Sequence, residues 1–302
     1  MTEAFYTILN GAAGGGRCRA RADRALYALR MAGVELAGVH LTEGPGHATD
    51  LAADAFADGH RRFLSVGGDG TAFEVINGLF PAALDAGETP TLGLLPLGTG
   101  NSFLRDFGVG TEAAARDALA RGRTRKVDVL ALVHAEGTLY YINTLGTGFV
   151  AEAGRLTNER FKSLGAAGYI AAVLTALARL DQPEVALRFD DDAAIDRAPA
   201  TFVTVANSRY TGGAMMLAPD ADPCDGVLDV VHVGPMRRGA LAAALRLVFS
   251  GAHVDLPEVR QRRARRVEWV DGAEQPLLID GELKVVTPLH ATVLPGAIEV
   301  VA

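Results

Sequence analysis

The stretch that decides the fold is Phe63-Leu64-Ser65-Val66-Gly67-Gly68-Asp69-Gly70-Thr71. Its first four residues predict a short buried strand that leads directly into a glycine-rich turn, and Ala72 to Leu79 predict a helix after it. Three glycines in four positions let the backbone approach a phosphate closely, because glycine has no side chain and adopts positive φ without steric cost. Asp69 is the only charged residue in this turn. We therefore expect a nucleotide phosphate site in which Asp69 acts through magnesium.

Strands and helices alternate on both sides of this stretch. The predicted strands are Tyr6–Asn10, Val34–Leu41, Phe63–Val66 and Thr91–Leu95, and the predicted helices are Arg17–Met31, His47–Asp58, Thr71–Leu79 and Thr111–Arg121. This alternation predicts a parallel sheet wrapped by helices, that is, a Rossmann-like α/β domain. Ligands bind such sheets at the carboxyl ends of the strands. The loop Pro96–Ser102 follows one of those ends, and its hydroxyl and amide groups, Asn101 among them, suit hydrogen bonding to a nucleotide.

The pattern changes near Asp128, where we place a domain boundary between residues 1–128 and 129–290. Short apolar runs separated by turns rich in Gly, Pro and Asp predict a β-sandwich or an open barrel. The runs are Val127–Val133, Thr138–Thr144, Glu184–Phe189, Ala200–Ala206, Val227–Val233, Arg266–Trp269, Leu277–Ile279 and Leu283–Val286. Two helices, Phe161–Leu180 and Arg237–Ser250, are expected to interrupt them.

Composition limits the classes of function. The 302 residues carry a net charge of −7, which gives no general electrostatic case for binding nucleic acid. The two cysteines, Cys18 and Cys224, do not indicate a disulfide framework or a metal cluster, so a reducing, cytoplasmic setting is expected. The N-terminus shows no secretion signal, and the longest apolar run, Gly165–Leu177, is too short to cross a bilayer comfortably. We expect any membrane substrate to be reached from the surface, by peripheral contact.

Several blocks occur in a characteristic order along the chain. They are Gly67–Thr71 followed by Glu74–Leu79, then Pro96–Asn101, then Ala206-Asn207, Gly212-Gly213 and Ala218-Pro219, then Asp225–Val230, and last Asp280–Glu282. Together they resemble the catalytic domain of the diacylglycerol kinase family, in the branch of soluble bacterial lipid kinases that is also similar to sphingosine and ceramide kinases. NAD kinases are similar in the first block, so the later blocks make the resemblance specific.

The resemblance implies a fold and a set of site residues. The fold is a nucleotide-binding α/β domain similar to that of NAD kinase and diacylglycerol kinase, followed by a β-sandwich for the lipid, with residues 291–302 returning to the first domain and catalysis in the cleft between the domains. Glu282 matches the general base that takes the proton of the lipid hydroxyl, while Asp225, with the backbone carbonyls of Asp222 and Val227, matches a magnesium site. The positions that match ATP contacts are Asn10, Thr42, Gly67, Gly68, Asp69, Gly70, Thr71 and Thr99.

Three positions depart from the family pattern. Gly11 stands where proline is usual after the first asparagine, and Phe73 stands where asparagine is common. Ser102 stands where many diacylglycerol kinases have aspartate. The missing carboxylate removes part of the usual acidic, metal-linked network, and it weakens the case for diacylglycerol against a sphingolipid or another lipid alcohol.

Structural interpretations of the same residues remain open. Asp69, Asp225-Gly226 and Asp280-Gly281 are also ordinary turn sequences, and Glu282 could be a solvated surface residue. The basic run Arg260, Arg262, Arg263, Arg265 and Arg266 is either a charged β edge or a contact for anionic lipid headgroups.

The combined prediction is an ATP- and magnesium-dependent lipid kinase that transfers the γ-phosphoryl group to the hydroxyl of a membrane lipid. Its partners would be a lipid at the membrane surface and no nucleic acid, and a homodimer is left open. Two alternatives remain, namely a kinase of the NAD kinase type that acts on a soluble substrate, and a non-catalytic lipid-binding protein of the same fold.

Overall fold

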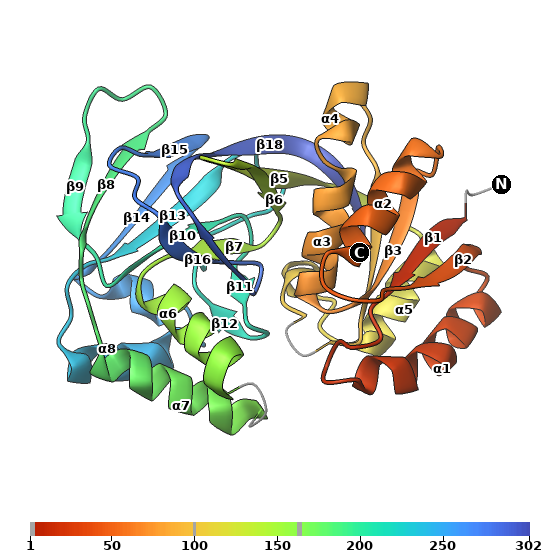
Figure 1. The fold of residues 1–302 in the computed structure, drawn as a ribbon, viewed down its shortest axis with the longest axis horizontal. Coiled ribbons are helices and arrows are strands. Elements are labelled where there is room, and N and C mark those ends of the chain that lie inside the picture. Colours follow the sequence, from red (N-terminus) through yellow and green to blue (C-terminus); the bar gives the residue numbers. More distant parts are fainter. Residues whose placement is uncertain (1–3, 99–100, 162–164) are drawn as a thin grey trace. The chain divides into compact units, whose positions relative to one another are not determined.

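The computed structural model describes residues 4–98, 101–161 and 165–302 (Figure 1). The chain divides into two compact units, which are described separately below. The first comprises the residues up to Val129 together with Pro223–Asp225 and Leu294–Ala302, and the second comprises Leu130–Asp222 and Gly226–Val293. Two strands, β5 (Thr124–His134) and β18 (Pro288–Val301), carry the chain from one unit to the other.

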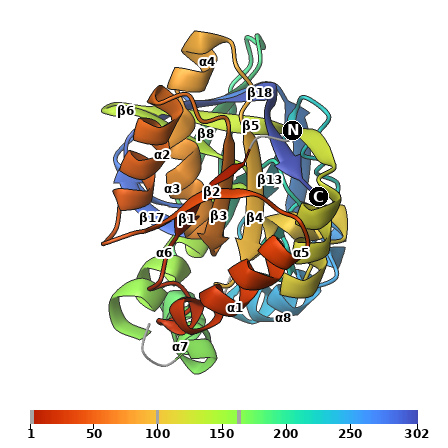
Figure 2. The ribbon, with the colours of Figure 1, turned by 90° about the vertical axis from the view of Figure 1, so that its right-hand side faces the viewer.

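The first unit is a doubly wound α/β fold, as the sequence predicts. Its parallel strands lie in the order β2-β1-β3-β4, and the end of β18 adds a further parallel strand beside β4. Helices α2 and α3 cover one face of this sheet and α1 and α5 cover the other (Figure 2). The bounds are β1 Phe5–Leu9, α1 Arg17–Met31, β2 Leu36–Leu41, α2 His47–Ala57, β3 Arg62–Gly67, α3 Asp69–Leu79, α4 Ala82–Ala86, β4 Thr91–Pro96 and α5 Glu112–Arg121.

Backbone hydrogen bonds explain two differences from the predicted boundaries. The second strand begins at Leu36 rather than Val34, because the Val34 N–H donates to the Leu29 carbonyl at 3.0 Å and closes the end of α1. The third helix begins at Asp69 rather than Thr71, because the N–H groups of Thr71 and Ala72 both donate to the Gly68 carbonyl. The sequence prediction also missed α4 and a 3₁₀ turn, η1 (Phe103–Phe107).

The second unit is the predicted β-sandwich. One sheet is antiparallel, in the order β14-β13-β10-β7-β16-β17. In the other, the beginning of β18 pairs with β15, β15 with β8 and β8 with β9, while β5 pairs with β6. The bounds are β6 Gly137–Tyr141, β7 Thr144–Gly146, β8 Glu184–Phe189, β9 Asp196–Pro199, β10 Phe202–Ala206, β11 Tyr210–Thr211, β12 Met215–Met216, β13 Leu228–Val233, β14 Val259–Ala264, β15 Arg266–Trp269, β16 Gln275–Ile279 and β17 Glu282–Val286.

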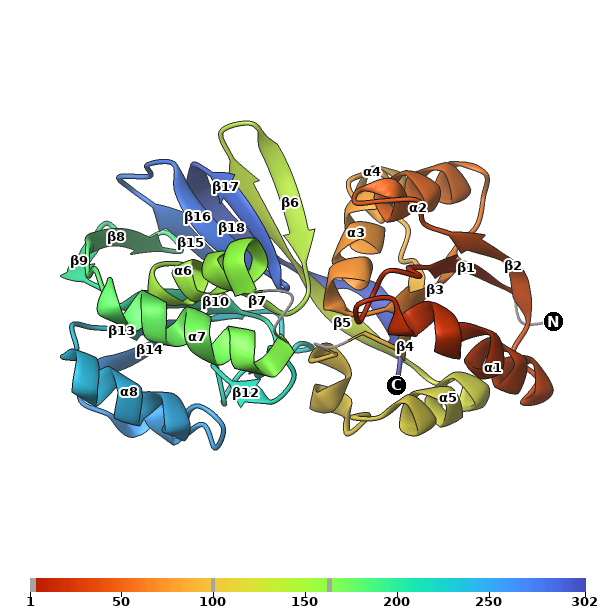
Figure 3. The same ribbon diagram turned by 60° about the horizontal axis from the view of Figure 1, so that its bottom comes forward.

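Three α-helices belong to the second unit: α6 (Phe149–Leu156), α7 (Gly165–Ala178) and α8 (Arg238–Leu247) (Figure 3). The predicted helix Phe161–Leu180 contains α7, and its residues 162–164 lie outside the described residues. The prediction missed α6, which Gly148 starts with a positive φ of 61°. Buried residues of all three helices, such as Leu156, Ala176 and Leu241, share one core with β10 and β13. Within the described ranges, no helix has both the length and the apolar character needed to cross a membrane.

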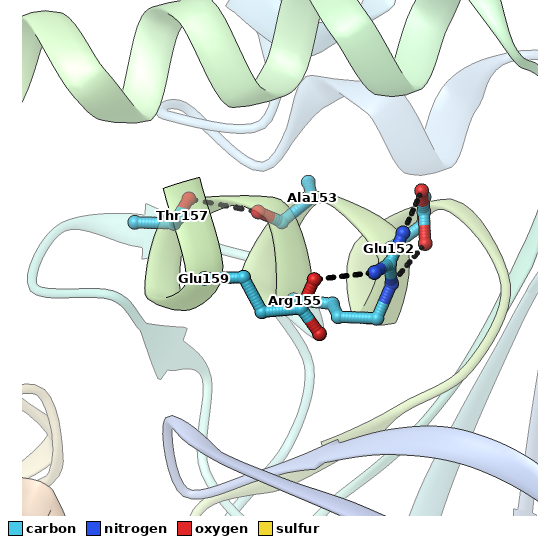
Figure 4. A network of polar contacts seen from close by, with 5 residues as sticks. All are labelled: Glu152, Ala153, Arg155, Thr157 and Glu159. Carbon is cyan, nitrogen blue, oxygen red and sulfur yellow. Dashed lines mark hydrogen bonds and ion pairs between the residues drawn. The ribbon is translucent and has the colours of Figure 1, made fainter. Parts of the chain in front are cut away.

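A π-helical turn, η2 (Thr157–Phe161), follows α6 and is held by a local charged network (Figure 4). The Arg155 guanidinium donates to both carboxylate oxygens of Glu152 at 2.8 Å and to Glu159 at 2.5 Å. The Thr157 hydroxyl donates to the Ala153 carbonyl at 2.7 Å. Hydrogen bonding to Arg155 lowers the pKa of Glu152, so this carboxylate stays charged and stabilises the irregular turn.

Three members of the arginine-rich run, Arg260, Arg262 and Arg263, lie in β14, an edge strand of the six-stranded sheet, as the charged-edge interpretation expects, while Arg266 begins the predicted strand β15. Arg260 donates to both carboxylate oxygens of Asp196 at 3.2 and 3.3 Å. Arg262 pairs with Asp192, and Arg263 lies 3.6 Å from the Asp229 carboxylate. The arrangement is the one expected for a charged β edge that is protected against further pairing.

Candidate active site

The Gly67–Thr71 turn contacts Leu97 and Gly98 of the next loop through backbone hydrogen bonds. The Gly67 carbonyl accepts hydrogen bonds from the N–H groups of Leu97 at 2.8 Å and Gly98 at 2.7 Å. A Cβ atom on Gly98 would lie 2.6 Å from the Gly68 Cα, and one on Gly67 would lie 2.3 Å from the Thr71 hydroxyl. A side chain at Gly98 would force the two loops apart, and one at Gly67 would clash with Thr71 inside the turn. Glycine is therefore needed for packing, and the loops present main chain at the N-terminus of α3, where an anion is favoured.

Two predicted ATP-binding residues meet across the carboxyl edge of the sheet. The Asn10 side-chain amide, directly after β1, donates to the Thr71 hydroxyl in the first turn of α3 at 3.1 Å. The Asn10 side-chain oxygen accepts from the Ala12 N–H at 3.1 Å, so the asparagine also shapes the loop where Gly11 replaces the usual proline. Thr42 lies at the same edge, because its N–H donates to the Leu9 carbonyl at the end of β1.

Asp69 is bound to the second loop. Its two carboxylate oxygens accept the Ser102 N–H at 3.0 and 2.9 Å, and the Ser102 hydroxyl and the Phe103 N–H donate to the same carboxylate. Burial raises the pKa of Asp69, while these donors oppose the rise. Ser102, which is fully buried, thus supplies a donor where a second aspartate would bring a like charge. The carboxylate fixes the start of η1 as well as lying beside the glycine turn.

Asn101 and Asp69 line a small pocket between β3, β4 and η1. Asn101 has a positive φ of 43°, and its side-chain amide donates to the Gly98 carbonyl at 2.7 Å. Its side-chain oxygen is buried and has no hydrogen-bond partner among the described residues. That oxygen is available for a donor group of a ligand. Thr99, another predicted ATP contact, lies outside the described residues.

Glu74 and Gly78, which belong to the same sequence block, hold α2 against α3. The Glu74 carboxylate accepts the N–H groups of Gly46 at 3.0 Å and Ala48 at 3.2 Å, so it caps α2, which has no capping side chain of its own. A Cβ atom on Gly78 would lie 2.2 Å from the Thr49 carbonyl oxygen. The spacing of Glu74 and Gly78 in this block therefore has a packing reason in addition to any nucleotide contact.

In the second unit, Asp280 anchors the hairpin that carries Glu282. Asp280 and Gly281 have positive φ values of 48° and 87°, as a two-residue type I′ turn between β16 and β17 requires. The Asp280 carboxylate, only 3% exposed, accepts the backbone N–H groups of Ile142, Asn143 and Thr144, each at 3.0 Å. This ties the hairpin to the connection between β6 and β7.

Glu282 is the first residue of β17, and its side chain is exposed. It pairs with Ile279 across the turn, so the Asp280 anchor sets its position. Glu282 belongs to the second compact unit, whereas Asn10, Thr42 and Asp69 belong to the first.

The predicted metal residues lie in a loop where the chain passes between the units. Asp222 and Val227 belong to the second unit and Asp225 to the first, and both aspartates are exposed. The next residue, Gly226, has a positive φ of 75°. No group of three or more His, Cys, Asp or Glu side chains suited to a metal occurs within the described ranges. Carboxylate and carbonyl oxygens, the groups predicted to bind the metal, are the donors that hard cations prefer.

Sequence reasoning missed two residues that organise the site. Ser102 was noted only as a departure from the family, and Asp280 only as a turn residue, yet both bind the site's backbone or carboxylates. A signal for Asp280 was present, because aspartate tolerates the left-handed conformation and its side chain accepts main-chain donors. Nothing local to the sequence indicates that its partners are residues 142–144.

Two families match successive parts of the chain. Residues 4–132 match the family described as the diacylglycerol kinase catalytic domain. Residues 143–302 match the family described as the YegS C-terminal NAD kinase beta sandwich-like domain.

Individual relatives agree along nearly the whole chain. A diacylglycerol kinase of Mycobacterium tuberculosis is 30% identical over 297 residues, covering 97% of this chain and 93% of the relative. A probable lipid kinase YegS-like of Xanthomonas oryzae is 33% identical over 264 residues, covering 85% of this chain and 84% of the relative. A crystal structure of a candidate diacylglycerol kinase from Bacillus anthracis superimposes with a TM-score of 0.77 at 25% identity, covering 99% of this chain and 95% of that one.

Proposed function

Because this chain belongs to the diacylglycerol kinase family of lipid kinases, phosphotransferases that use ATP, we propose that it transfers the γ-phosphoryl group of ATP to the hydroxyl of a membrane lipid. The observation that carries the proposal is the backbone contact between the Gly67–Thr71 turn and the Gly98 loop at the N-terminus of α3. Phosphoryl transfer depends mainly on alignment and charge stabilisation, and the main-chain N–H groups at the start of α3, which this contact holds in place, would supply both.

In this proposal the first unit holds the nucleotide. The N–H groups at the start of α3 bind phosphate oxygens, and the Asn10–Thr71 hydrogen bond keeps the Thr71 hydroxyl oriented toward them. Thr42, Thr99 and Asn101 contribute hydrogen bonds from the neighbouring loops. The buried, unpartnered side-chain oxygen of Asn101 supports a donor group of the nucleotide in this region.

Asp69 receives a more specific role than the sequence indicated. Its carboxylate is already bound by donors from Ser102 and Phe103, so its first task is to hold the Asn101–Phe103 segment against the glycine turn. We propose that its negative charge also favours magnesium beside the phosphates. Because position 102 carries a hydroxyl instead of a second carboxylate, Asp69 is the one carboxylate in this contact.

Magnesium, when bound, would neutralise charge on the phosphates. The residues assigned to a second position are Asp225, through its carboxylate, and Asp222 and Val227, through their carbonyls. The oxygen-only donor set fits magnesium or calcium rather than a softer metal.

Glu282 is the proposed general base. It is exposed at the start of β17, and the buried Asp280 anchor limits the mobility of the turn that presents it. A carboxylate in this role accepts the proton of the lipid hydroxyl as the hydroxyl oxygen attacks the γ-phosphorus. Because general-base groups contribute typically 100- to 10,000-fold, its loss should be easy to measure.

The acceptor is proposed to be diacylglycerol or a similar lipid alcohol, such as ceramide or a sphingoid base. The names of the mycobacterial and Bacillus subtilis relatives support diacylglycerol. Because Ser102 stands where many diacylglycerol kinases have aspartate, ceramide and sphingoid bases also remain candidate acceptors.

The test is a transfer assay with radiolabelled ATP, magnesium and a panel of lipid alcohols in detergent micelles. Glu282→Gln and Asp69→Asn should each lower the rate at least about 100-fold while far-ultraviolet circular dichroism stays unchanged. Glu274→Gln, an exposed glutamate just before β16, is the matched control and should keep wild-type activity. Near-normal rates in both site variants would refute the mechanism.

The second candidate is phosphorylation of a soluble substrate, which the NAD kinase likeness of the β-sandwich family favours. An assay with NAD in place of the lipid distinguishes the two, because only an NAD kinase would give a labelled dinucleotide. Calorimetry with ATP tests the third candidate, a lipid-binding protein without catalysis, which predicts no heat of nucleotide binding.

A further inference from the structure

The second unit contains a second set of arginines, at the two ends of α8. Arg237 and Arg238 precede or open the helix, and Arg246 lies in its last turn. Between Asp229 and Asp255 the chain contains no acidic residue, although its overall net charge is −7. This segment is therefore a local positive region in an acidic protein.

These arginines differ from those of β14 in their partners. Arg260 and Arg262 are neutralised by Asp196 and Asp192. Arg237, Arg238 and Arg246 are exposed, and in the described part of the chain none of them forms an ion pair. Their charge is available to an anionic partner, whereas that of Arg260 and Arg262 is already compensated.

Exposed apolar side chains accompany the free arginines. Phe249, just after α8, is 61% exposed and Leu247 is 36% exposed. Leu174 of α7 is 60% exposed, and α7 lies beside α8 (Figures 1 and 3). Leu241 and Ala244 of α8, and Val248 directly after it, attach the helix to the core. The exposed residues are thus not required for packing within the unit.

We propose that Arg237, Arg238, Arg246, Leu247 and Phe249, here called the α8 surface, dock the protein on a bilayer that contains anionic lipids. Arginines beside aromatic and leucine side chains match the interface of such a bilayer, where the charges meet headgroups and the rings enter the acyl boundary. The positive charge of the three arginines complements anionic headgroups, and this is why we propose an anionic bilayer as the partner. The inference goes beyond the proposed function, because docking can be measured without any turnover.

The first test compares two matched pairs of arginines by cosedimentation with vesicles. R237Q/R238Q and R260Q/R262Q remove the same charge from the same unit. On vesicles of phosphatidylcholine and phosphatidylglycerol, the first variant should bind about 25-fold more weakly, since each arginine contributes roughly fivefold. The second should change by less than about twofold. Equal losses, or no loss in the first variant, would overturn the proposal.

The second test places a probe in the surface. The single natural tryptophan, Trp269, is 5% exposed, so its fluorescence should respond little to vesicles. In Phe249→Trp, vesicles with phosphatidylglycerol should shift the emission to shorter wavelength, and phosphatidylcholine alone should not. Binding without this shift would place the contact elsewhere and overturn the assignment.

Two controls separate docking from folding and from catalysis. Leu84→Ala removes a leucine side chain from α4 of the first unit, and this leucine is 41% exposed, close to the 36% of Leu247. The change should leave vesicle binding unchanged. Phe249→Ala should weaken vesicle binding yet leave the phosphorylation of a short-chain, monomeric lipid alcohol at the wild-type rate. Vesicle binding that persists in Phe249→Ala and in R237Q/R238Q would refute the α8 surface, whatever the outcome of the kinase assay.

Discussion

Asp69 and Asp280 stand before a glycine in two sequence blocks of the same family, and both accept backbone N–H groups, but in different surroundings. Asp280 is almost fully buried and binds three consecutive amides of a distant connection. Asp69 is only partly buried, lines a pocket and binds the neighbouring loop through Ser102 and Phe103. Two motif aspartates thus have different structural roles, since Asp280 maintains the fold and Asp69 shapes a candidate ligand site.

The largest effect is expected for Asp280→Ala. The N–H groups of Ile142, Asn143 and Thr144 would lose their acceptor in a buried setting, which should lower the free energy of unfolding by about 3 to 5 kcal/mol. Urea unfolding measures this. Asp190 provides the control, because it also has a positive φ and accepts two N–H groups but is exposed, so Asp190→Ala should cost about 1 kcal/mol. Similar losses in the two variants would show that burial does not distinguish Asp280.

Gly98→Ala tests the loop that Asp69 holds. The new Cβ would lie 2.6 Å from the Gly68 Cα, so we expect a loss of about 1 to 3 kcal/mol in the free energy of unfolding and a clear loss of ATP affinity. Calorimetric titration with ATP gives the second quantity. Gly239→Ala in α8, whose new Cβ meets no atom within 4 Å, should lower neither the free energy of unfolding nor the ATP affinity. Normal ATP binding in Gly98→Ala would contradict the proposed role of the backbone contact.

Ser102→Ala sharpens the description of Asp69. The Ser102 N–H remains and only its hydroxyl is lost, so the free energy of unfolding should fall by about 1 kcal/mol. The same change removes a donor that opposes the burial effect, so the pKa of Asp69 should rise further. Nuclear magnetic resonance titration of the carboxyl group would measure the pKa, and an unchanged value would exclude the Ser102 hydroxyl as a contributor.

The smallest effect concerns pH. Because the folded-state pKa of Asp69 lies above 3.8, the folded state holds a proton that the unfolded state releases first. Its contribution to stability is therefore present below pH 3.8 and is lost as pH rises through the folded-state value. Asp69→Asn lacks this contribution. As pH rises through that range, the free energy of unfolding of the wild type should therefore fall relative to that of the variant. A constant difference would show that burial does not dominate the pKa.

The first unit illustrates which elements were predictable. The Arg, Ala and Leu pattern of α1 and the glycine after it gave both ends of that helix, Arg17 and Met31. The parallel strands followed from apolar runs that each precede a polar loop. By contrast, β18 was missed because its 14 residues mix polar and apolar side chains, and β14 was expected only as one of two interpretations because its arginines hide the strand pattern. Their strand character depends on the neighbours β15, β4 and β13.

By itself, the sequence determined the family, the two kinds of domain and the positions of the glycine turn and the Asp-Gly-Glu hairpin, because local conformational preferences and motif order are written along the chain. The side-chain partners became known from the three-dimensional structure. Asp69 accepts a hydrogen bond from Ser102, Asp280 accepts hydrogen bonds from residues 142–144, and arginines of β14 form ion pairs with nearby aspartates, whereas the arginines of α8 are exposed. The physical reason is that a hydrogen bond or ion pair joins groups that are close in space, and folding brings together residues whose separation in sequence carries no information about their contact.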